Sequence, residues 1–356
     1  MGIRFERDSR RATNGPLIFF SIYHDEAFEE EIRSAFLSGL SFYAYRFPND
    51  NMFSYGSSEG YVEGIGTPGF TIGMFNPNMP LITIPYNGTK RIETPLSLYT
   101  MPSRSTPWEE YSHEVEEIIK DLKDDPESKV VATRTVVKEI SNFDIADIFY
   151  ETCSRFPESF VFCFSTPATG CWIGASPELL LSGKPGTLES MALAGTRAYG
   201  TQEPWDEKNI KEQSIVKDYI VKIFDNNGLT PSIEENFNQR AGSIEHICTP
   251  IKAKLNGGVN LGKLLKELSP TPALCGFPKD FALREIQRLE NFERGCYGGF
   301  CGPFHSIEDF RFNVVLRCAS VTEKRQCLYA GGGITSRSNI QKEWEETNLK
   351  LSNIFV

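Results

Sequence analysis

Residues 159–194 read SFVFCFSTPATGCWIGASPELLLSGKPGTLESMALA, and this stretch decides the fold class. Three runs rich in apolar residues, Ser159–Ser165, Trp172–Leu181 and Leu188–Ala194, are separated by short segments that contain Pro or Gly. Such runs between turn residues are typical of β-strands. Because short turns join antiparallel strands, whereas parallel strands need a long crossover, the stretch predicts consecutive antiparallel strands.

The same pattern extends in both directions along the chain. Further strands are predicted at Lys129–Ile140, Ile244–Ala253, Tyr297–Gly302, Phe312–Ser320 and Gln326–Ala330. Helical periodicity predicts helices at Asp25–Leu40, Trp108–Lys123, Ile145–Arg155, Trp205–Phe224, Leu261–Leu268, Asp280–Asn291 and Ile340–Phe355. The helices come singly, without strict alternation with strands. The sequence therefore predicts an α+β fold built on antiparallel sheets.

Composition limits the class of protein. The chain has 356 residues and a net charge of −10, and its basic residues form no block, which argues against binding to nucleic acid or anionic membranes. The N-terminus lacks a signal-type apolar core, and no apolar run has membrane-spanning length. Nine cysteines without any CxxC pair argue against a disulfide framework or a zinc site. We expect a soluble cytoplasmic protein whose cysteines pack as small apolar side chains.

Acidic residues in two predicted helices suggest a metal site. In the last helix, Glu343, Glu346 and Lys350 fall along one edge of the apolar stripe, and in the helix 205–224 Glu212 extends the buried stripe by one turn. Carboxylates from separate helices are the ligands that Mg²⁺ prefers. A solvated face with Glu–Lys pairs remains the alternative for the last helix, and Glu212 could simply reach water.

Other candidate residues carry weaker signals. Gly331, Gly332 and Gly333 follow a predicted strand and could let backbone N–H groups approach an anion, although a plain tight turn would use the same residues. Lys129 opens a predicted strand, where a surface position is the ordinary alternative. Glu178 follows Pro177 within a strand-like run, and His246 could be either a ligand contact or a core histidine.

A series of short blocks resembles the chorismate-utilising enzymes, in the same order as in that family. The blocks are KVVATR at 129–134, ASPELL at 175–180, LAGTR at 193–197, HICT at 246–249, PTPALCGFP at 270–278, YGG at 297–299, LRCA at 316–319, AGGGI at 330–334 and EWEETNLK at 343–350. The resemblance runs from about Trp108 to the C-terminus. It implies one chorismate-binding domain over residues 1–356, with a divergent N-terminal part at 1–105 and the recognisable catalytic part at 106–356.

The resemblance also implies an architecture and a binding site. Family members, which include anthranilate and aminodeoxychorismate synthases, stack two large antiparallel sheets face to face with helices outside. By resemblance, Glu212 and Glu346 would be direct Mg²⁺ ligands, and Glu343 would act through water. The metal would hold the ring carboxylate of chorismate. The substrate-binding residues implied in the same way are Gly195, Thr196, His246, Ala273, Tyr297, Arg317, Lys350 and the loop Gly331–Gly333, with Arg317, Lys350 and the loop holding the enolpyruvyl carboxylate.

The isochorismate-forming branch of the family assigns two catalytic roles. Lys129 would be the general base that activates water for attack at ring C2, and Glu178 the general acid that protonates the departing C4 hydroxyl. This chemistry requires Lys129 partly neutral and Glu178 partly protonated near pH 7, through burial and neighbouring charges.

A few positions separate the reactions within the family. Anthranilate and aminodeoxychorismate synthases generally have glutamine where this chain has Lys129, so the amination reactions are disfavoured. Salicylate synthases share the lysine but typically carry Thr-Ala at the position of Ala273-Leu274, although Tyr297 and Leu316 are compatible with them. We therefore predict an isochorismate synthase for menaquinone or siderophore biosynthesis, monomeric by resemblance. The alternatives are a salicylate synthase, a non-catalytic chorismate-binding protein, or a synthase subunit that depends on an amidotransferase.

Overall fold

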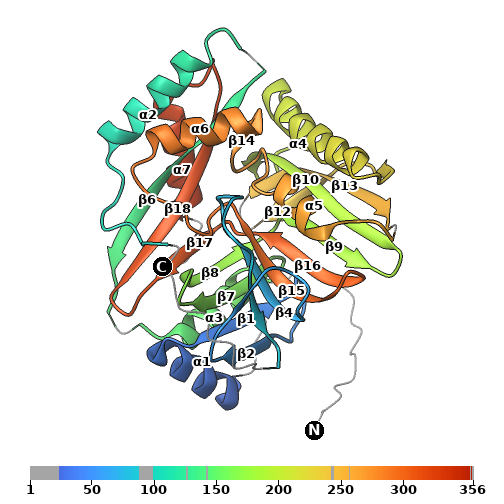
Figure 1. Cartoon of the computed structure of the whole chain (residues 1–356). Coiled ribbons are helices and arrows are strands. Elements are labelled where there is room, and N and C mark those ends of the chain that lie inside the picture. Colours follow the sequence, from blue (N-terminus) through green and yellow to red (C-terminus); the bar gives the residue numbers. More distant parts are fainter. Residues whose placement is uncertain are drawn as a thin grey trace.

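A computed structural model of the chain describes residues 24–87, 99–125, 127–141, 143–241, 244–255, 257–352 and 354. Parts of the N-terminal region 1–105, namely residues 1–23 and 88–98, lie outside the described residues, as does Phe355 at the end of the last predicted helix. In the described part, strands form two antiparallel sheets of eight and ten strands with helices outside them, and the α+β prediction is confirmed (Figure 1).

The helices agree closely with the sequence prediction. They are α1 (Glu26–Ser38), α2 (Trp108–Asp121), α3 (Ile145–Arg155), α4 (Glu207–Asn226), α5 (Leu261–Leu268), α6 (Lys279–Leu289) and α7 (Ile340–Ser352). Polar side chains begin several of them: Asp144 accepts hydrogen bonds from two amides of the first turn of α3, and Asp206 accepts one from Asn209 in α4. These caps satisfy amides that have no partner within the helix.

The strands divide between the sheets as follows. In chain order, the eight-stranded sheet contains β1 (Ser41–Arg46), β2 (Ser54–Ser58), β6 (Lys129–Glu139), β7 (Phe160–Thr166), β8 (Gly170–Ser176), β14 (Gly276–Phe277), β17 (Cys318–Val321) and β18 (Arg325–Ile334). The ten-stranded sheet contains β3 (Val62–Glu63), β4 (Gly69–Gly73), β5 (Ile82–Pro85), β9 (Leu179–Lys184), β10 (Thr187–Ala198), β11 (Pro231–Ile233), β12 (Phe237–Ala241), β13 (Ile244–Lys254), β15 (Phe300–Ser306) and β16 (Asp309–Val314). The N-terminal part thus supplies strands to both sheets.

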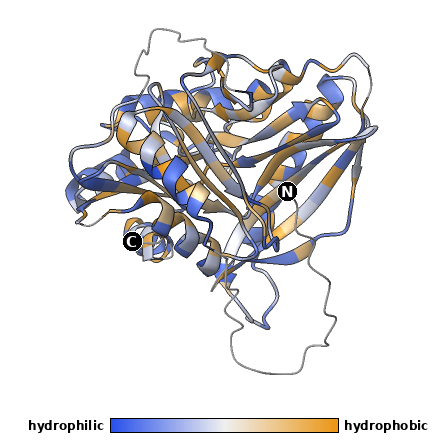
Figure 2. Cartoon of the chain, turned by 90° about the horizontal axis from the view of Figure 1, so that it is seen from below, coloured by the Kyte–Doolittle hydropathy of each residue, from blue (hydrophilic) through white to orange (hydrophobic). Residues whose placement is uncertain are grey.

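The hydrophobic core follows from this stacking. The largest cluster joins side chains of both sheets, such as Phe162 of β7 and Phe312 of β16, with the inner sides of α4 and α5. A second cluster lies under α1 and α3, and a third under α2 and α6. The helices carry hydrophilic and hydrophobic residues along their length (Figure 2). All nine cysteines are buried and free, which confirms that they pack as apolar side chains.

Two of the predicted strands are wrong in an informative way. The run Trp172–Leu181 is two strands: β8 belongs to the eight-stranded sheet, whereas β9 belongs to the ten-stranded sheet. The run Phe312–Ser320 likewise divides into β16 and β17, which pair with β9 and β8 respectively. Two neighbouring segments therefore pass from one sheet to the other. One crosses at Pro177-Glu178 and the other at Arg317.

Candidate active site

A cavity of about 270 Å³ opens where the chain crosses between the sheets. All but two of the residues predicted for the site line it: Lys129, Glu178, Gly195, Thr196, Glu212, His246, Ala273, Tyr297, Arg317, Gly331, Gly333, Glu346 and Lys350. Glu343 instead lines an adjoining cavity of about 850 Å³, which Lys129, Glu212 and Glu346 also border. The tertiary structure thus gathers residues that lie as far apart in sequence as Lys129 and Lys350.

Glu178 is a buried carboxyl at the first crossing. Its side chain is almost inaccessible to solvent, and burial raises its pKa to about 8, even though a hydrogen bond from Thr271 and the charges of Lys129 and Arg317 act in the opposite direction. Thr271 Oγ1 lies 3.4 Å from Glu178 Oε1. Near pH 7 this carboxyl therefore keeps its proton and can donate it.

Thr271 was not singled out from the sequence, although it belongs to the PTP block at 270–272. The chain adjacent to Glu178 is also held firmly, because its backbone carbonyl accepts hydrogen bonds from Val314 N and Asn313 Nδ2, both at 3.0 Å. These bonds join β16 to the crossing and keep the acid in place.

Lys129 is the first residue of β6 and is 4% exposed. Its ammonium lies beside Gly333 of the neighbouring strand β18: a Cβ atom at Gly333 would be 3.0 Å from Lys129 Cε and 3.1 Å from Nζ. The lysine charge lowers the pKa of Glu178 and, as a minor contribution, that of Glu346. Lys129 therefore enters the cavity between the buried acid and the carboxylates of the helices.

The three glycines do not form a loop, which corrects the sequence interpretation. Gly331, Gly332 and Gly333 lie within β18 and pair with Thr133, Ala132 and Val131 of β6. They are small because side chains pack closely against them: a Cβ at Gly332 would lie 3.1 Å from Glu343 Oε2, and Gly333 leaves room for Lys129. The carbonyl of Gly331 accepts a hydrogen bond of 2.8 Å from Lys350 Nζ.

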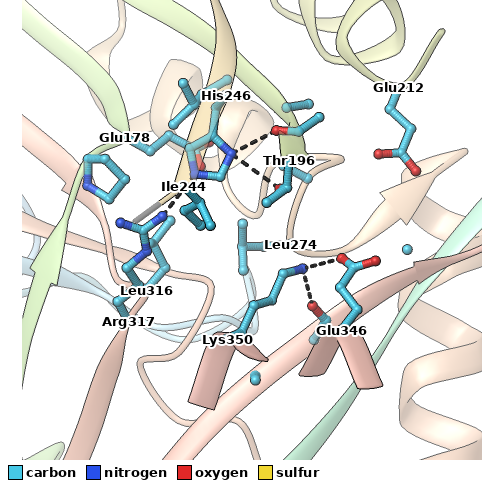
Figure 3. Close-up of a pocket in the computed structure, with 18 of the residues that line it drawn as sticks. Glu178, Thr196, Glu212, Ile244, His246, Leu274, Leu316, Arg317, Glu346 and Lys350 are labelled. Atoms are coloured by element: carbon cyan, nitrogen blue, oxygen red, sulfur yellow. Dashed lines mark hydrogen bonds and ion pairs between the residues drawn. The ribbon is translucent and has the colours of Figure 1, made fainter. Parts of the chain in front are cut away.

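Arg317 and His246 form a hydrogen-bonded pair in the wall of the cavity (Figure 3). Arg317 has a φ of 47°, an unusual backbone conformation for a residue with a side chain, and its Nη2 donates to His246 Nε2 at 2.8 Å. His246 Nδ1 lies 2.7 Å from the carbonyl oxygen of Gly195. Burial, followed by the charge of Arg317, lowers the pKa of His246 to about 3. The imidazole is therefore neutral, with its proton on Nδ1.

Gly195 and Thr196 lie at an irregularity in β10, where the pairing with β13 shifts between Ala194 and Arg197. Gly195 has a φ of 73°, which favours glycine, and the amide of Thr196 donates to Asn209 Oδ1 at 3.0 Å. Asn209 was missed in the sequence, and no pattern in this region indicated it. The shift turns Gly195 and Thr196 toward the cavity.

The acidic residues come from two helices that face each other. Glu212 lies on α4, and Glu346 lies on α7, where it forms an ion pair of 2.8 Å with Lys350 (Figure 3). Glu343, one turn earlier on α7, is 4% exposed. Its Oε1 accepts from Ser338 at 2.8 Å and lies 3.8 Å from Lys208 Nζ.

The surroundings of these carboxylates indicate whether they suit a metal ion. In the described part of the chain, no three His, Cys, Asp or Glu side chains lie close enough together to hold a metal ion. However, Glu343 Oε2 is buried without a hydrogen-bond partner among the described residues, and burial raises the pKa of this carboxyl. A carboxyl with an unpartnered buried oxygen, in a cavity that Glu212 and Glu346 also border, is chemically suited to a hard cation. Lys208, which the sequence analysis did not single out, supplies positive charge here.

Comparison with known proteins identifies the family of the chain. The family described as chorismate binding enzyme matches residues 86–355. Isochorismate synthase EntC of Escherichia coli K12 is 30% identical over 241 residues, which are 64% of this chain and 61% of EntC, so the chain covers less than two thirds of that relative. The vibriobactin-specific isochorismate synthase of Vibrio cholerae is 27% identical over 310 residues, covering 81% of this chain and 78% of the relative.

Solved structures share the fold. The menaquinone-specific isochorismate synthase MenF of Escherichia coli has a TM-score of 0.73 at 20% identity, covering 88% of this chain and 87% of MenF. Anthranilate synthase component I of Streptococcus pneumoniae has a TM-score of 0.63 at 18% identity, covering 88% of this chain and 92% of that protein. No described helix has the length and apolar character needed to span a membrane. With a family match over most of its length, the chain belongs to the chorismate binding enzymes.

Proposed function

We propose that the chain is an isochorismate synthase that converts chorismate to isochorismate. One observation carries the proposal: a buried carboxyl that keeps its proton, Glu178, and a lysine, Lys129, line one cavity together with an arginine. Moving a hydroxyl group from one ring position to another requires such an acid and base. The isochorismate synthases among the relatives support the same reaction.

In the proposed reaction, chorismate lies between the walls of the cavity. Lys129, as the general base, takes a proton from water, whose oxygen forms a bond to ring C2. Both ring double bonds shift by one position as the bond from C4 to its hydroxyl breaks, and Glu178 gives its proton to the departing hydroxyl, which leaves as water. One water is consumed and one released, so the reaction is an isomerisation.

The charges of the cavity suit the substrate carboxylates. Arg317 faces the cavity with its guanidinium oriented by neutral His246, and a planar guanidinium can bind a carboxylate through two hydrogen bonds. Lys350 lies nearby on α7. Chorismate has two carboxylates, and we assign the enolpyruvyl carboxylate to Arg317 and Lys350.

Mg²⁺ would be held by Glu212 and Glu346, with Glu343 acting through water, and when bound it would neutralise the ring carboxylate and orient the ring. Glu212, Glu343 and Glu346 all border the second cavity, and a cation bound there would offset their repulsion of an anionic substrate. Menaquinone and siderophore biosynthesis both use isochorismate, and relatives named for each are found, so the proposed activity serves either pathway.

A product assay tests the proposal. Purified protein is incubated with chorismate and Mg²⁺, with EDTA, and with added ammonium, and the products are separated by chromatography. Isochorismate that disappears in EDTA and does not respond to ammonium is the expected result. Salicylate with pyruvate would instead place the chain with salicylate synthases, anthranilate would refute the role of Lys129, and the absence of any product would refute turnover.

A further inference from the structure

Behind the cavity wall, Arg294 and Glu290 form an ion pair that is cut off from solvent. Arg294 lies between α6 and β15, and the two side chains are 1% and 2% exposed. Arg294 Nε donates to Glu290 Oε2 at 2.8 Å, and Nη2 of the same guanidinium also contacts Glu290 Oε1. Although burial alone would lower the pKa of Arg294, Glu290 raises it above its ordinary value. Neither residue lines the cavity in which the reaction is proposed.

The pair also forms hydrogen bonds with the backbone of two other segments. Arg294 Nη2 donates to the carbonyl oxygen of Val131 at 2.6 Å, and Nη1 donates to that of Leu274 at 2.7 Å. Glu290 Oε1 accepts a hydrogen bond of 3.2 Å from the amide of Thr133. The ion pair therefore joins β6 to the segment around Leu274.

These contacts replace a missing strand at the edge of β6. Its neighbour on this side, β14, pairs only with Lys129 and Val130, and α6 lies against the same edge (Figure 1). Beyond that point, the carbonyl of Val131 and the amide of Thr133 would have no strand partner. Because buried backbone groups without partners are costly, a side-chain ion pair that supplies both an N–H donor and an oxygen acceptor stabilises the strand there.

Each segment held by the pair carries a residue of the cavity. Val131 is two residues from Lys129, and the Leu274 carbonyl adjoins the Ala273-Leu274 wall. The backbone carbonyl of Arg294 also accepts a hydrogen bond of 3.0 Å from the amide of Tyr297, a third cavity residue. The Arg294–Glu290 pair thus contacts the segments that carry Lys129, the Ala273-Leu274 wall and Tyr297.

We propose that Arg294, held by Glu290, is a positioning residue that sets the placement of Lys129 relative to the Ala273-Leu274 wall. The inference rests on the proposed isochorismate synthase function for its kinetic readout. Without the guanidinium, β6 and the segment of Leu274 keep the β14 pairing and the hydrogen bond from Val131 N to Cys275 O, but they lose the bonds that Arg294 donates to both of them. The base then shifts from the attacking water, while the carboxylate-binding groups Arg317 and Lys350 stay in place.

The test compares Arg294→Met and the milder Arg294→Lys with a matched control, Arg46→Met. Arg46 is also buried and donates to backbone carbonyls, including that of Phe156 at 2.7 Å, but it does not line the cavity. We expect Arg294→Met to lower kcat about 100-fold with little change in KM, because misplacement of a catalytic group by about 1 Å has an effect of this size. Arg294→Lys should retain an intermediate kcat, since one ammonium can reach only some of the acceptors. Arg46→Met should lower the melting temperature but leave kcat unchanged.

A second readout does not depend on the reaction. Hydrogen–deuterium exchange should become faster in Arg294→Met in the peptides covering 129–135 and 270–277 together, and in neither of them in Arg46→Met. Arg294→Lys decides the matter if Arg294→Met does not fold. A folded Arg294 variant with normal kcat, or with unchanged exchange in both peptides, would overturn the proposal. If the unaltered protein makes no isochorismate, the proposed function fails, whereas the exchange measurement still tests the anchor.

Discussion

Arg317 donates a hydrogen bond of 2.8 Å from Nη2 to Nε2 of His246, and His246 in turn contacts the carbonyl of Gly195 at 2.7 Å through Nδ1. A neutral imidazole suits this series of hydrogen bonds, because Nε2 accepts from Arg317 while Nδ1 donates to Gly195. The histidine therefore orients the guanidinium without adding a second positive charge. In the proposed binding mode, the arginine remains the charged group for a substrate carboxylate.

The first prediction concerns this pair. His246→Phe removes the acceptor for Arg317, so we expect KM for chorismate to rise about tenfold or more, the value of a hydrogen bond to a charged group. His246→Gln, which can accept and donate, should recover part of the loss. Steady-state kinetics of both variants check this. Because the pKa of His246 is lowered to about 3, the unaltered protein should show no ionisation of this residue between pH 5 and 8. A kinetic step in that range that disappears in His246→Gln would contradict the neutral imidazole.

The second prediction concerns the buried acid. With a pKa of about 8, Glu178 should lose its proton above that pH, and turnover should fall there. Glu178→Gln should lower kcat by about 100-fold or more, the usual contribution of a general acid, and abolish the alkaline fall in the residual rate. A pH–rate profile of both proteins makes the measurement. An alkaline fall that is unchanged in Glu178→Gln would assign it to another group.

The same carboxyl makes a separate prediction about stability. The pKa of Glu178 in the folded chain is higher than that of an unfolded glutamate, about 4.3. The unfolded chain therefore releases this proton first, and the contribution of Glu178 to the free energy of unfolding declines as pH rises from about 4.3 to about 8. Glu178→Gln should be more stable than the unaltered protein at pH 8.5, with a smaller difference at pH 5. Thermal unfolding at the two pH values checks the sign, and a variant that is less stable at pH 8.5 would contradict it.

The third prediction uses the close approach of Gly333 to Lys129. A methyl group at Gly333 would lie 3.1 Å from Lys129 Nζ, so the flexible lysine must move aside. Gly333→Ala should lower kcat about tenfold or more through misplacement of the base, with little loss of stability. Gly258→Ala is the matched control, because a Cβ there meets no atom within 4 Å. Equal kcat values for the two variants would show that the position of the lysine does not limit the reaction.

The fourth prediction concerns the metal. Glu212→Gln and Glu346→Gln should each raise the Kd for Mg²⁺ by at least about tenfold, since even residues that only support metal ligands have effects of this size. Glu127→Gln is the control. Glu127 borders the larger cavity, as Glu212 and Glu346 do, but it is exposed and forms an ion pair of 2.7 Å with Lys211. Calorimetric titration of the purified chains with Mg²⁺ measures binding without substrate. Equal weakening in all three variants would mean that the ion binds only through general negative charge.

The sequence by itself determined the fold class, the helices and most of the residues in the cavity. The bounds of α3 and α5 were predicted without error, because an apolar stripe at helical spacing is a local property with local caps. The ordered blocks from KVVATR to EWEETNLK carried the family resemblance, since the residues that bind one substrate leave recognisable short motifs. The monomeric state, the cytoplasmic location and the undivided domain over residues 1–356 stay predictions.

Only the tertiary structure decided where the chain changes sheets. Pro177-Glu178 and Arg317 lie inside continuous apolar runs, and both halves of each run are buried in one sheet or the other, so no change in periodicity marks the crossing. Gly331–Gly333 resembled a loop in the sequence although it is part of a strand. The side chains that pack against these glycines, Lys129 and Glu343, come from distant segments, so the local sequence does not show why glycine is needed there. The raised pKa of Glu178 and the Arg294–Glu290 anchor likewise depend on burial and on long-range contacts, which local sequence does not encode.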